Sequence, residues 1–352
     1  MRIHDNLIRL SATDLVGHLA CRHLTALDLS VATGKRAEPK GFDPFLDALV
    51  KRGLDHERGF IEHLQKSGVT VTTIDGPSGA RQVADTTAAM RKGVDVIVQA
   101  ALVQGRWEGR ADILRRIAMK TNLGDWGYEV IDTKLARETK GGTVLQLCLY
   151  SDLVATIQGE LADKMYVVTP LSGYEPIEFR TNDYMTYCRF VRVRLEAAVD
   201  GAASDSYPEP KAHCDICRWD RECDARRRKD DHLSLVAGIS KMQMGELERN
   251  AIETTEALST MPLPMSWKPK RGAARTFERV REQARVQVEG RRLQKPVHEV
   301  LPPEPGFGLS RLPEPSPGDV FFDFEGDPFV GEAGLEYLFG TCVTDDADAL
   351  QY

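Results

Sequence analysis

The segment YEVIDTKLARETKGGTVLQLCLY, residues 128–150, decides how the chain is interpreted. The apolar residues Val130 and Ile131 lead directly into Asp132, and Lys134 follows after one intervening residue. Alternate side chains of a β-strand project from the same face, so an extended segment places Asp132 beside Lys134. Exposed acid–lysine pairs are common and contribute only about 0 to 1 kcal/mol, so the pair alone is weak evidence for a site. Its meaning depends on what the rest of the chain supplies.

The length of 352 residues predicts two or three folded units. With 42% hydrophobic and 28% charged residues, the composition is ordinary for a water-soluble protein, and no apolar run is long enough to span a membrane. The first fifteen residues, MRIHDNLIRLSATDL, carry charges inside any apolar stretch and do not resemble a signal peptide. We therefore expect a cytoplasmic protein with no membrane partner.

The net charge of -7 does not favour nucleic-acid binding, but the charges are unevenly distributed. Residues 268–295 contain ten Lys or Arg and three Glu, a local excess of seven positive charges. Phosphate binding depends on such local clusters more than on the total charge. We expect this segment to contact nucleic-acid backbone, and a solvated helix face is the equally weighted alternative.

The periodicity of apolar residues predicts helices interleaved with strands. Ser11, with Asp14 three residues later, is typical of a helix N-terminus, and that helix is expected to carry Cys21. The order of the elements predicts an α/β domain over residues 1–230, a helical hairpin with a basic linker or arm over 231–315, and the start of an incomplete domain over 316–352. The expected helices are 44–66, 81–93 and 182–201, and the expected strands are 69–75, 94–103, 128–135 and 164–170.

A second acidic residue gives the Asp132–Lys134 pair a possible partner. Asp112 lies 20 residues before Asp132, a separation that a strand, a turn and a second strand can bridge. Mg²⁺ and Mn²⁺ prefer oxygen ligands, and Mg²⁺ often takes only one or two carboxylates from the protein. A lysine beside such an ion can orient the attacking water and offset negative charge on phosphorus. His56 can add a nitrogen ligand.

Four short motifs, in order, carry a resemblance to a known family. They are G-L-D-H-E (53–57), G-R-A-D (109–112), I-D-T-K (131–134) and Q-L-C-L-Y (146–150), and together they resemble the motifs of RecB-type nucleases of the PD-(D/E)XK superfamily. The resemblance implies a restriction-endonuclease-like core, a mixed sheet flanked by helices. It also implies that His56, Asp112 and Asp132 hold the metal ion, that Lys134 is the catalytic lysine, and that Gln146 and Tyr150 face the DNA.

The cysteines give an independent signal. Cys214, Cys217 and Cys223 form a C-x2-C-x5-C pattern that needs a fourth ligand, for which Cys21 is the natural candidate. One cysteine before the nuclease motifs and three after them is similar to the iron–sulfur site of AddB-type and CRISPR-associated RecB-like nucleases, which implies a [4Fe-4S] cluster. Zinc is the alternative, with His213 or His23 as a nitrogen ligand. The remaining cysteines are expected to be buried thiols: Cys148, Cys188 and Cys342.

The segment 316–352 contains a further acidic motif. Asp323 and Glu325 follow an apolar run and project to one side of an expected strand. This resembles the first metal motif of DEDD-type exonucleases with an RNase H-like fold. The other acids of such a site are not in the sequence, so the site is expected to be incomplete, and an exposed acidic strand end is an equal alternative.

The sequence therefore predicts a divalent-metal-dependent deoxyribonuclease, expected to be an exonuclease on single-stranded DNA or DNA ends in repair, recombination or defence. Some bacterial RecB-like nucleases with this arrangement continue into a helicase, which implies a helicase domain or partner. One alternative is a non-catalytic nucleic-acid-binding module stabilised by a zinc or iron–sulfur site. A zinc-stapled scaffold for protein partners is a weaker alternative, because it leaves the acidic residues unexplained.

Overall fold

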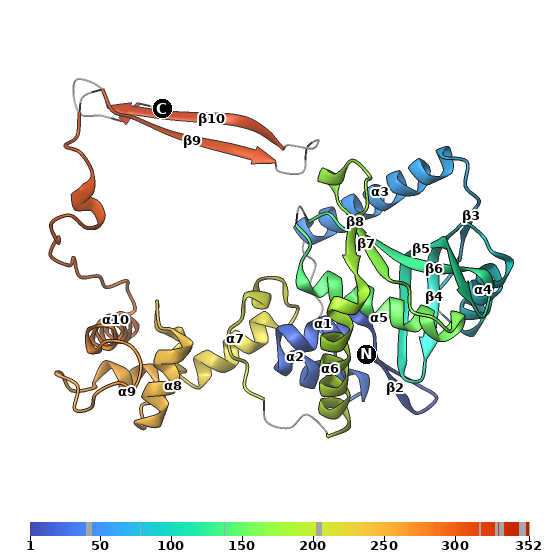
Figure 1. Ribbon diagram of the computed structural model, residues 1–352. Coiled ribbons are helices and arrows are strands. Elements are labelled where there is room, and N and C mark those ends of the chain that lie inside the picture. Colours follow the sequence, from blue (N-terminus) through green and yellow to red (C-terminus); the bar gives the residue numbers. More distant parts are fainter. Residues whose placement is uncertain are drawn as a thin grey trace. The chain divides into compact units, whose positions relative to one another are not determined.

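The computed structural model describes residues 1–39, 44–77, 79–136, 138–201, 206–316, 318–327, 330, 334–344 and 350–351. The chain forms two compact units (Figure 1). The first comprises Met1–Tyr207 and Lys211–Asp220, and the second comprises Pro208–Pro210 and Arg221–Tyr352. The predicted domain boundaries at residues 230 and 315 stay predictions.

A six-stranded mixed sheet organises the first unit. Its strand order is β3-β4-β5-β6-β7-β8. The β3–β4 and β6–β7 pairs are parallel, and the other three pairs are antiparallel. The strands are β3 (Val71–Thr73), β4 (Val96–Gln104), β5 (Trp107–Thr121), β6 (Gly124–Thr133), β7 (Lys164–Val168) and β8 (Ile177–Arg180).

Helices cover both faces of this sheet (Figure 1). On one face, Phe60 of α3 (Pro44–Lys66) packs with residues of β4 to β7 such as Val98 and Ile131. On the other face, α5 (Gly141–Gln158) contributes most of its apolar residues to the main core. The parallel β6–β7 pair requires a crossover, and α5 provides it. The predicted α/β class, a mixed sheet flanked by helices, is confirmed at this level.

Further helices and a short hairpin complete the first unit around the sheet. Helix α4 (Ala80–Lys92) contacts β4, and α6 (Thr181–Asp200) contacts α5. The hairpin of β1 (Arg2–His4) and β2 (Leu7–Arg9) leads into Leu10, which exchanges backbone hydrogen bonds with Arg106 and Glu108 at the start of β5. The hairpin has no counterpart in the sequence-based expectations.

The N-terminal helical region differs from the prediction at Cys21. Ser11 and Asp14 form the expected capping box of α1 (Ala12–Ala20). Cys21 is not in a helix, however, because its backbone is extended (φ -154°, ψ 112°) between α1 and α2 (Arg22–Ala32). Its N–H still bonds to the Gly17 carbonyl at 2.8 Å. Cys21 therefore lies at the junction of two helices.

The second unit contains a small helical core. The helices are α7 (Asp220–Lys229), α8 (Lys241–Arg249), α9 (Thr255–Ser259) and α10 (Ala274–Leu293). The prediction of a basic linker or arm is wrong for α10, whose side chains at i, i+3 and i+7 are buried: Phe277, Val280 and Ala284. A continuous apolar stripe of this kind docks a helix onto a core, whatever the charge of its other faces.

A three-stranded antiparallel sheet follows, with the order β11-β10-β9. Its strands are β9 (Val320–Asp327), β10 (Leu335–Thr344) and β11 (Leu350–Gln351). Side chains of β9 and β10 are mostly exposed. Cys342 is only half-buried, so the prediction of a buried thiol is wrong there, whereas Cys148 and Cys188 are buried as predicted.

No helix within the described part of the chain is long and apolar enough to cross a membrane.

Candidate functional site

Asp112 and Asp132 lie side by side on neighbouring strands. The antiparallel register pairs Ile113 of β5 with Ile131 of β6. Asp112, the residue before Ile113, therefore lies opposite Asp132, the residue after Ile131. Thr133 ties the two strand ends together, because its N–H donates to Asp112 Oδ2 at 3.0 Å and its hydroxyl lies 3.3 Å from the same oxygen. The two predicted metal-binding carboxylates therefore converge.

Asp132 is fully buried, and each of its carboxylate oxygens has a different neighbour. Gln146 on α5 donates from Nε2 to Oδ1 at 2.9 Å. Lys134 Nζ lies 2.5 Å from Oδ2. Oδ2 makes no hydrogen bond to any described residue, so its contact with Lys134 is counted as an ion pair. This buried oxygen is therefore paired with one cation, Lys134, whose side chain is 31% exposed.

The electrostatics of the pair follow from this burial. Burial and, after it, the neighbouring Asp112 carboxylate raise the pKa of Asp132, Lys134 lowers it, and the balance of these effects places the pKa at about 8. Two neighbouring carboxyl groups therefore share one lysine in a place where the ionised form of Asp132 is disfavoured. Such a site favours the binding of an additional cation.

The residues around Asp112 explain why the G-R-A-D motif has its composition. Gly109 leaves room for the ring of Tyr150, because a Cβ at that position would lie 2.3 Å from Tyr150 Cε1. Arg110 donates to the backbone carbonyls of Ile74 and Gly76. Gly109 and Arg110 therefore hold the first part of β5 in place, directly before Asp112.

The side chains predicted to face DNA lie largely inside the protein. Tyr150 is only 7% exposed, and burial raises the pKa of its hydroxyl, with smaller contributions from Asp112 and Asp132. Gln146 is half-buried and holds Asp132. Both residues belong to the acidic site in this structure, as neighbours of its carboxylates.

His56 is engaged elsewhere. Its Nε2 lies 3.3 Å from the Val168 carbonyl oxygen, which also accepts the backbone N–H of Lys134 at 2.9 Å, and its ring stacks on Tyr174. Among the residues that the structure describes, no group of three or more His, Cys, Asp or Glu is arranged to hold a metal ion. The structure therefore brings together Asp112, Asp132 and Lys134, and does not assemble a three-ligand set with His56.

Glu57, the next residue on α3, is the acidic neighbour that the sequence analysis missed as a site residue. Its carboxylate accepts a hydrogen bond from Gln99 Nε2 at 2.5 Å. Burial raises the pKa of Glu57, and the charge of Asp112 raises it further, whereas Gln99, Lys134 and Arg110 lower it. Glu57 stands in the quoted G-L-D-H-E motif, so the signal was present but was assigned to the adjacent histidine.

The chemistry of the acidic pair fits a hard divalent cation. Mg²⁺ commonly binds through one or two carboxylates, with water and substrate oxygens completing its octahedron. Asp132 Oδ2 offers a buried oxygen without a hydrogen bond, and Asp112 stands beside it. The donor set therefore suits Mg²⁺ or Mn²⁺ without requiring a third protein ligand.

Three of the four predicted cluster cysteines lie in the first unit. Burial raises the pKa of the Cys217 thiol, and the nearby Cys214 and Cys21 raise it further. The segment that carries Cys214 and Cys217 is attached to α2, because Arg218 and Trp219 both donate to Asp28, at 2.7 and 3.1 Å. Cys21 is therefore a neighbour of this segment despite its distance in sequence. Cys223 lies on α7, in the second unit.

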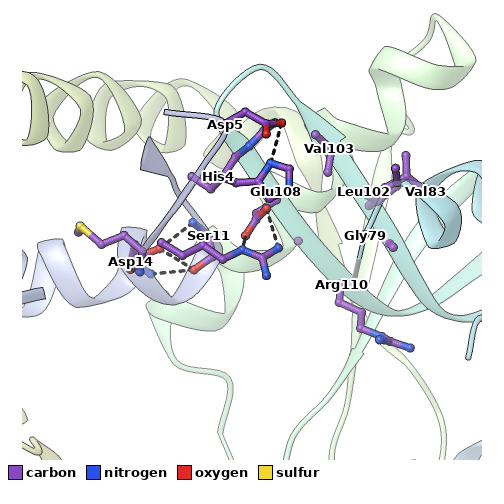
Figure 2. Close-up of a pocket in the computed structure, with 16 residues that line it drawn as sticks. His4, Asp5, Ser11, Asp14, Gly79, Val83, Leu102, Val103, Glu108 and Arg110 are labelled. Atoms are coloured by element: carbon purple, nitrogen blue, oxygen red, sulfur yellow. Dashed lines mark hydrogen bonds and ion pairs between the residues drawn. The ribbon is translucent and has the colours of Figure 1, made fainter. Parts of the chain in front are cut away.

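A groove of about 810 Å³ lies between the N-terminal hairpin and the β4–β5 edge (Figure 2). Arg2 pairs with Glu108 across it, and Arg110 lines its far side. The groove includes neither Asp112 nor Asp132. Arg110 connects the groove to the acidic pair, because it lines the groove and lies two residues before Asp112 on β5.

Asp323 and Glu325, the predicted incomplete second site, lie on the exposed strand β9. Asp323 Oδ1 accepts the N–H of Phe324 at 2.9 Å. The partners across the strand pair are Gly340 and Leu338, which carry no acidic group.

Comparison with known proteins finds no family model that matches the chain and no curated protein that matches it.

Proposed function

We propose that the protein is a divalent-metal-dependent nuclease with its active site at Asp112, Asp132 and Lys134. The observation that supports this most is the fully buried Asp132, whose Oδ2 lies 2.5 Å from the Lys134 ammonium and makes no hydrogen bond to a described residue, next to the carboxyl group of Asp112. A buried arrangement with this charge imbalance is costly to folding unless a cation or a function compensates for it.

The order of the elements supports the same proposal. A three-strand meander of β4, β5 and β6, followed by α5 and the parallel strand β7, carries the acids on its second and third strands. A mixed sheet flanked by helices is what the resemblance to RecB-type nucleases implies for a restriction-endonuclease-like core, and this sheet is of that class. We include the nuclease-type core in the proposal for that reason.

The residues divide the chemistry of phosphodiester hydrolysis among them. Asp112 and Asp132 would hold the ion, which supplies a more acidic water molecule and polarises the phosphate oxygens when bound. Lys134 is placed to orient the attacking water and to stabilise negative charge on the phosphate in the transition state. Gln146 fixes the orientation of the Asp132 carboxylate through Oδ1. DNA, as single strands or ends, is the proposed substrate, with a helicase as a possible partner and the cytoplasm as the expected location.

A [4Fe-4S] cluster on Cys21, Cys214, Cys217 and Cys223 belongs to this proposal, with zinc as the alternative metal. The support is the adjacency of Cys21, Cys214 and Cys217 in the first unit. Anaerobically purified protein should be brown, with visible absorbance and bound iron. Colourless protein that contains zinc instead would replace the iron–sulfur assignment.

The nuclease proposal is tested by incubating the full chain with end-labelled single-stranded and duplex DNA, with Mg²⁺, Mn²⁺ or EDTA. We expect cleavage that requires the metal and is lost in Asp112→Asn. A chain that binds DNA in every condition and cleaves in none would leave the non-catalytic binding module as the better account.

A further inference from the structure

Gln99, in the middle of β4, has a backbone conformation that strands do not use. Its φ of 56° lies in the left-handed region, which residues with a side chain adopt rarely and at an energetic cost. Glycine and asparagine adopt this conformation more easily, but residue 99 is a glutamine. A strained residue inside an otherwise regular strand indicates that something else in the structure holds it.

The conformation at Gln99 reverses the side-chain alternation of the strand. Val98 packs in the cluster on the face covered by α3, and Ala100 packs in the main core on the opposite face, although residues two apart in a strand normally share a face. An extended Gln99 would point away from the face of Val98. The left-handed backbone instead allows its side chain to reach α3, where it donates to Glu57.

Gln99 also lies level with the acidic pair. The β4–β5 register pairs Val98 with Ile113 and continues unchanged beyond it, so Gln99 stands opposite Asp112. Asp112 in turn stands beside Asp132. The residue that reaches Glu57 is thus at the level of the two carboxylates, with Glu57 held on the α3 side and Asp132 held by Gln146 from the α5 side.

From this geometry we infer that Gln99 is a positioning residue that holds Glu57 as a third carboxylate of the acidic site. Glu57 is not in direct ligand geometry with Asp112 and Asp132, since the described residues contain no three-residue metal group. Its role is to add negative charge and to accept hydrogen bonds from water molecules on a bound cation. The influence of Asp112 on the pKa of Glu57 is consistent with this placement. The inference rests on the proposed function.

The inference predicts changes in cation binding that can be measured without nucleic acid or catalysis. Titration of the full chain with Mn²⁺, followed by the electron paramagnetic resonance signal of the free ion, gives the dissociation constant. Glu57→Gln should weaken Mn²⁺ binding roughly tenfold, as expected when an outer-shell partner is lost. Glu62→Gln is the matched control, because it removes the same charge from an exposed position on the same helix and should leave binding unchanged.

Gln99→Gly separates positioning from backbone structure. Glycine adopts the left-handed conformation without strain, so the melting temperature should stay the same or rise, while the loss of the amide should weaken Mn²⁺ binding several-fold. Gln99→Gly also keeps the inference testable if Glu57→Gln does not fold.

The outcomes are distinct. Wild-type protein that binds Mn²⁺ and cleaves DNA, with unchanged binding in Glu57→Gln and Gln99→Gly, would overturn the inference and leave the nuclease proposal standing. Wild-type protein that neither binds Mn²⁺ nor cleaves would overturn both.

Discussion

The acidic row of the sheet, formed by Asp112 and Asp132, and the basic helix α10 both contain many charged residues, but these charges have opposite surroundings. In the sheet, Asp132 is fully buried beside Asp112, with one lysine as counter-charge. On α10, Arg285 lies 2.7 Å from Glu282 and 2.6 Å from Glu299, and Arg291 lies 2.6 Å from Asp231. One region crowds two carboxyl groups around a single lysine in a buried place, and the other pairs its charges at the surface.

The difference shows that a count of charges along the sequence is a poor guide to function. The excess of positive charge in residues 268–295 is reduced in the folded chain by acids from outside that segment, such as Asp231, Glu256 and Glu299. The acidic row contains far fewer charges, yet they are concentrated and incompletely compensated. Incomplete compensation in a buried place is the more informative sign of a site.

The largest expected effect is on catalysis at the acidic row. Lys134→Ala should reduce the cleavage rate by at least about 10² to 10³, because it removes the charge placed to stabilise the transition state. Folding, measured by circular dichroism, and DNA binding should change little, since the Lys134 amine is partly exposed. Lys164→Ala is the control, because this lysine pairs with Glu178 on the exposed surface of the same sheet. Equal activity in the two variants would show that Lys134 has no catalytic role.

The second effect is on the free energy of unfolding, and its sign should differ between the buried Asp132 and the surface residue Asp200. Asp132→Asn should lose activity but raise the free energy of unfolding at neutral pH by about 1 to 4 kcal/mol, because the fold raises the pKa of this carboxyl and so opposes its ionisation, whereas asparagine carries no charge and keeps a similar shape and an acceptor for Gln146. Asp200→Asn should instead lower it by about 0 to 1 kcal/mol, because it breaks the surface pair with Arg106. Urea unfolding of both variants gives the comparison. Destabilisation by Asp132→Asn would mean that the carboxylate serves folding.

How much of the site the sequence could predict depends on the range of the interaction. Strand alternation correctly places Asp132 beside Lys134, although β6 ends at Thr133 and the lysine follows just beyond it. The convergence of Asp112 with Asp132 is also correct, because it needs only one turn between adjacent strands. The bond from the Thr133 N–H to Asp112 could not be foreseen, since it depends on the register of the pair.

Other features depend on how whole elements dock. His56 and Glu57 are adjacent on α3 and therefore point in directions about 100° apart, so only the docked helix decides which one approaches the acids. Gln99 carries no sequence signal for a left-handed conformation, which glycine or asparagine would have given. On α10, the apolar stripe around Phe277 was hidden by the density of arginine, and the segment was interpreted as a linker.

The smallest expected effect concerns the ion pairs of helix α10. Arg285→Gln should change the free energy of unfolding by no more than about 1 kcal/mol, because its ion pairs are at the surface. It should also leave the slope of log Kd for single-stranded DNA against log salt concentration unchanged, since an arginine already paired with two acids has little to offer a phosphate.

Arg279 is the informative counterpart, because it is exposed on the same helix. If α10 contacts the nucleic-acid backbone, Arg279→Gln should reduce the slope by about one, the amount expected for one lost phosphate contact, while Arg285→Gln does not. Unchanged slopes in both variants would favour the solvated helix face. A reduced slope for Arg285→Gln would show that the ion pairs open on binding, and the contrast between the two regions would then hold only in the free protein.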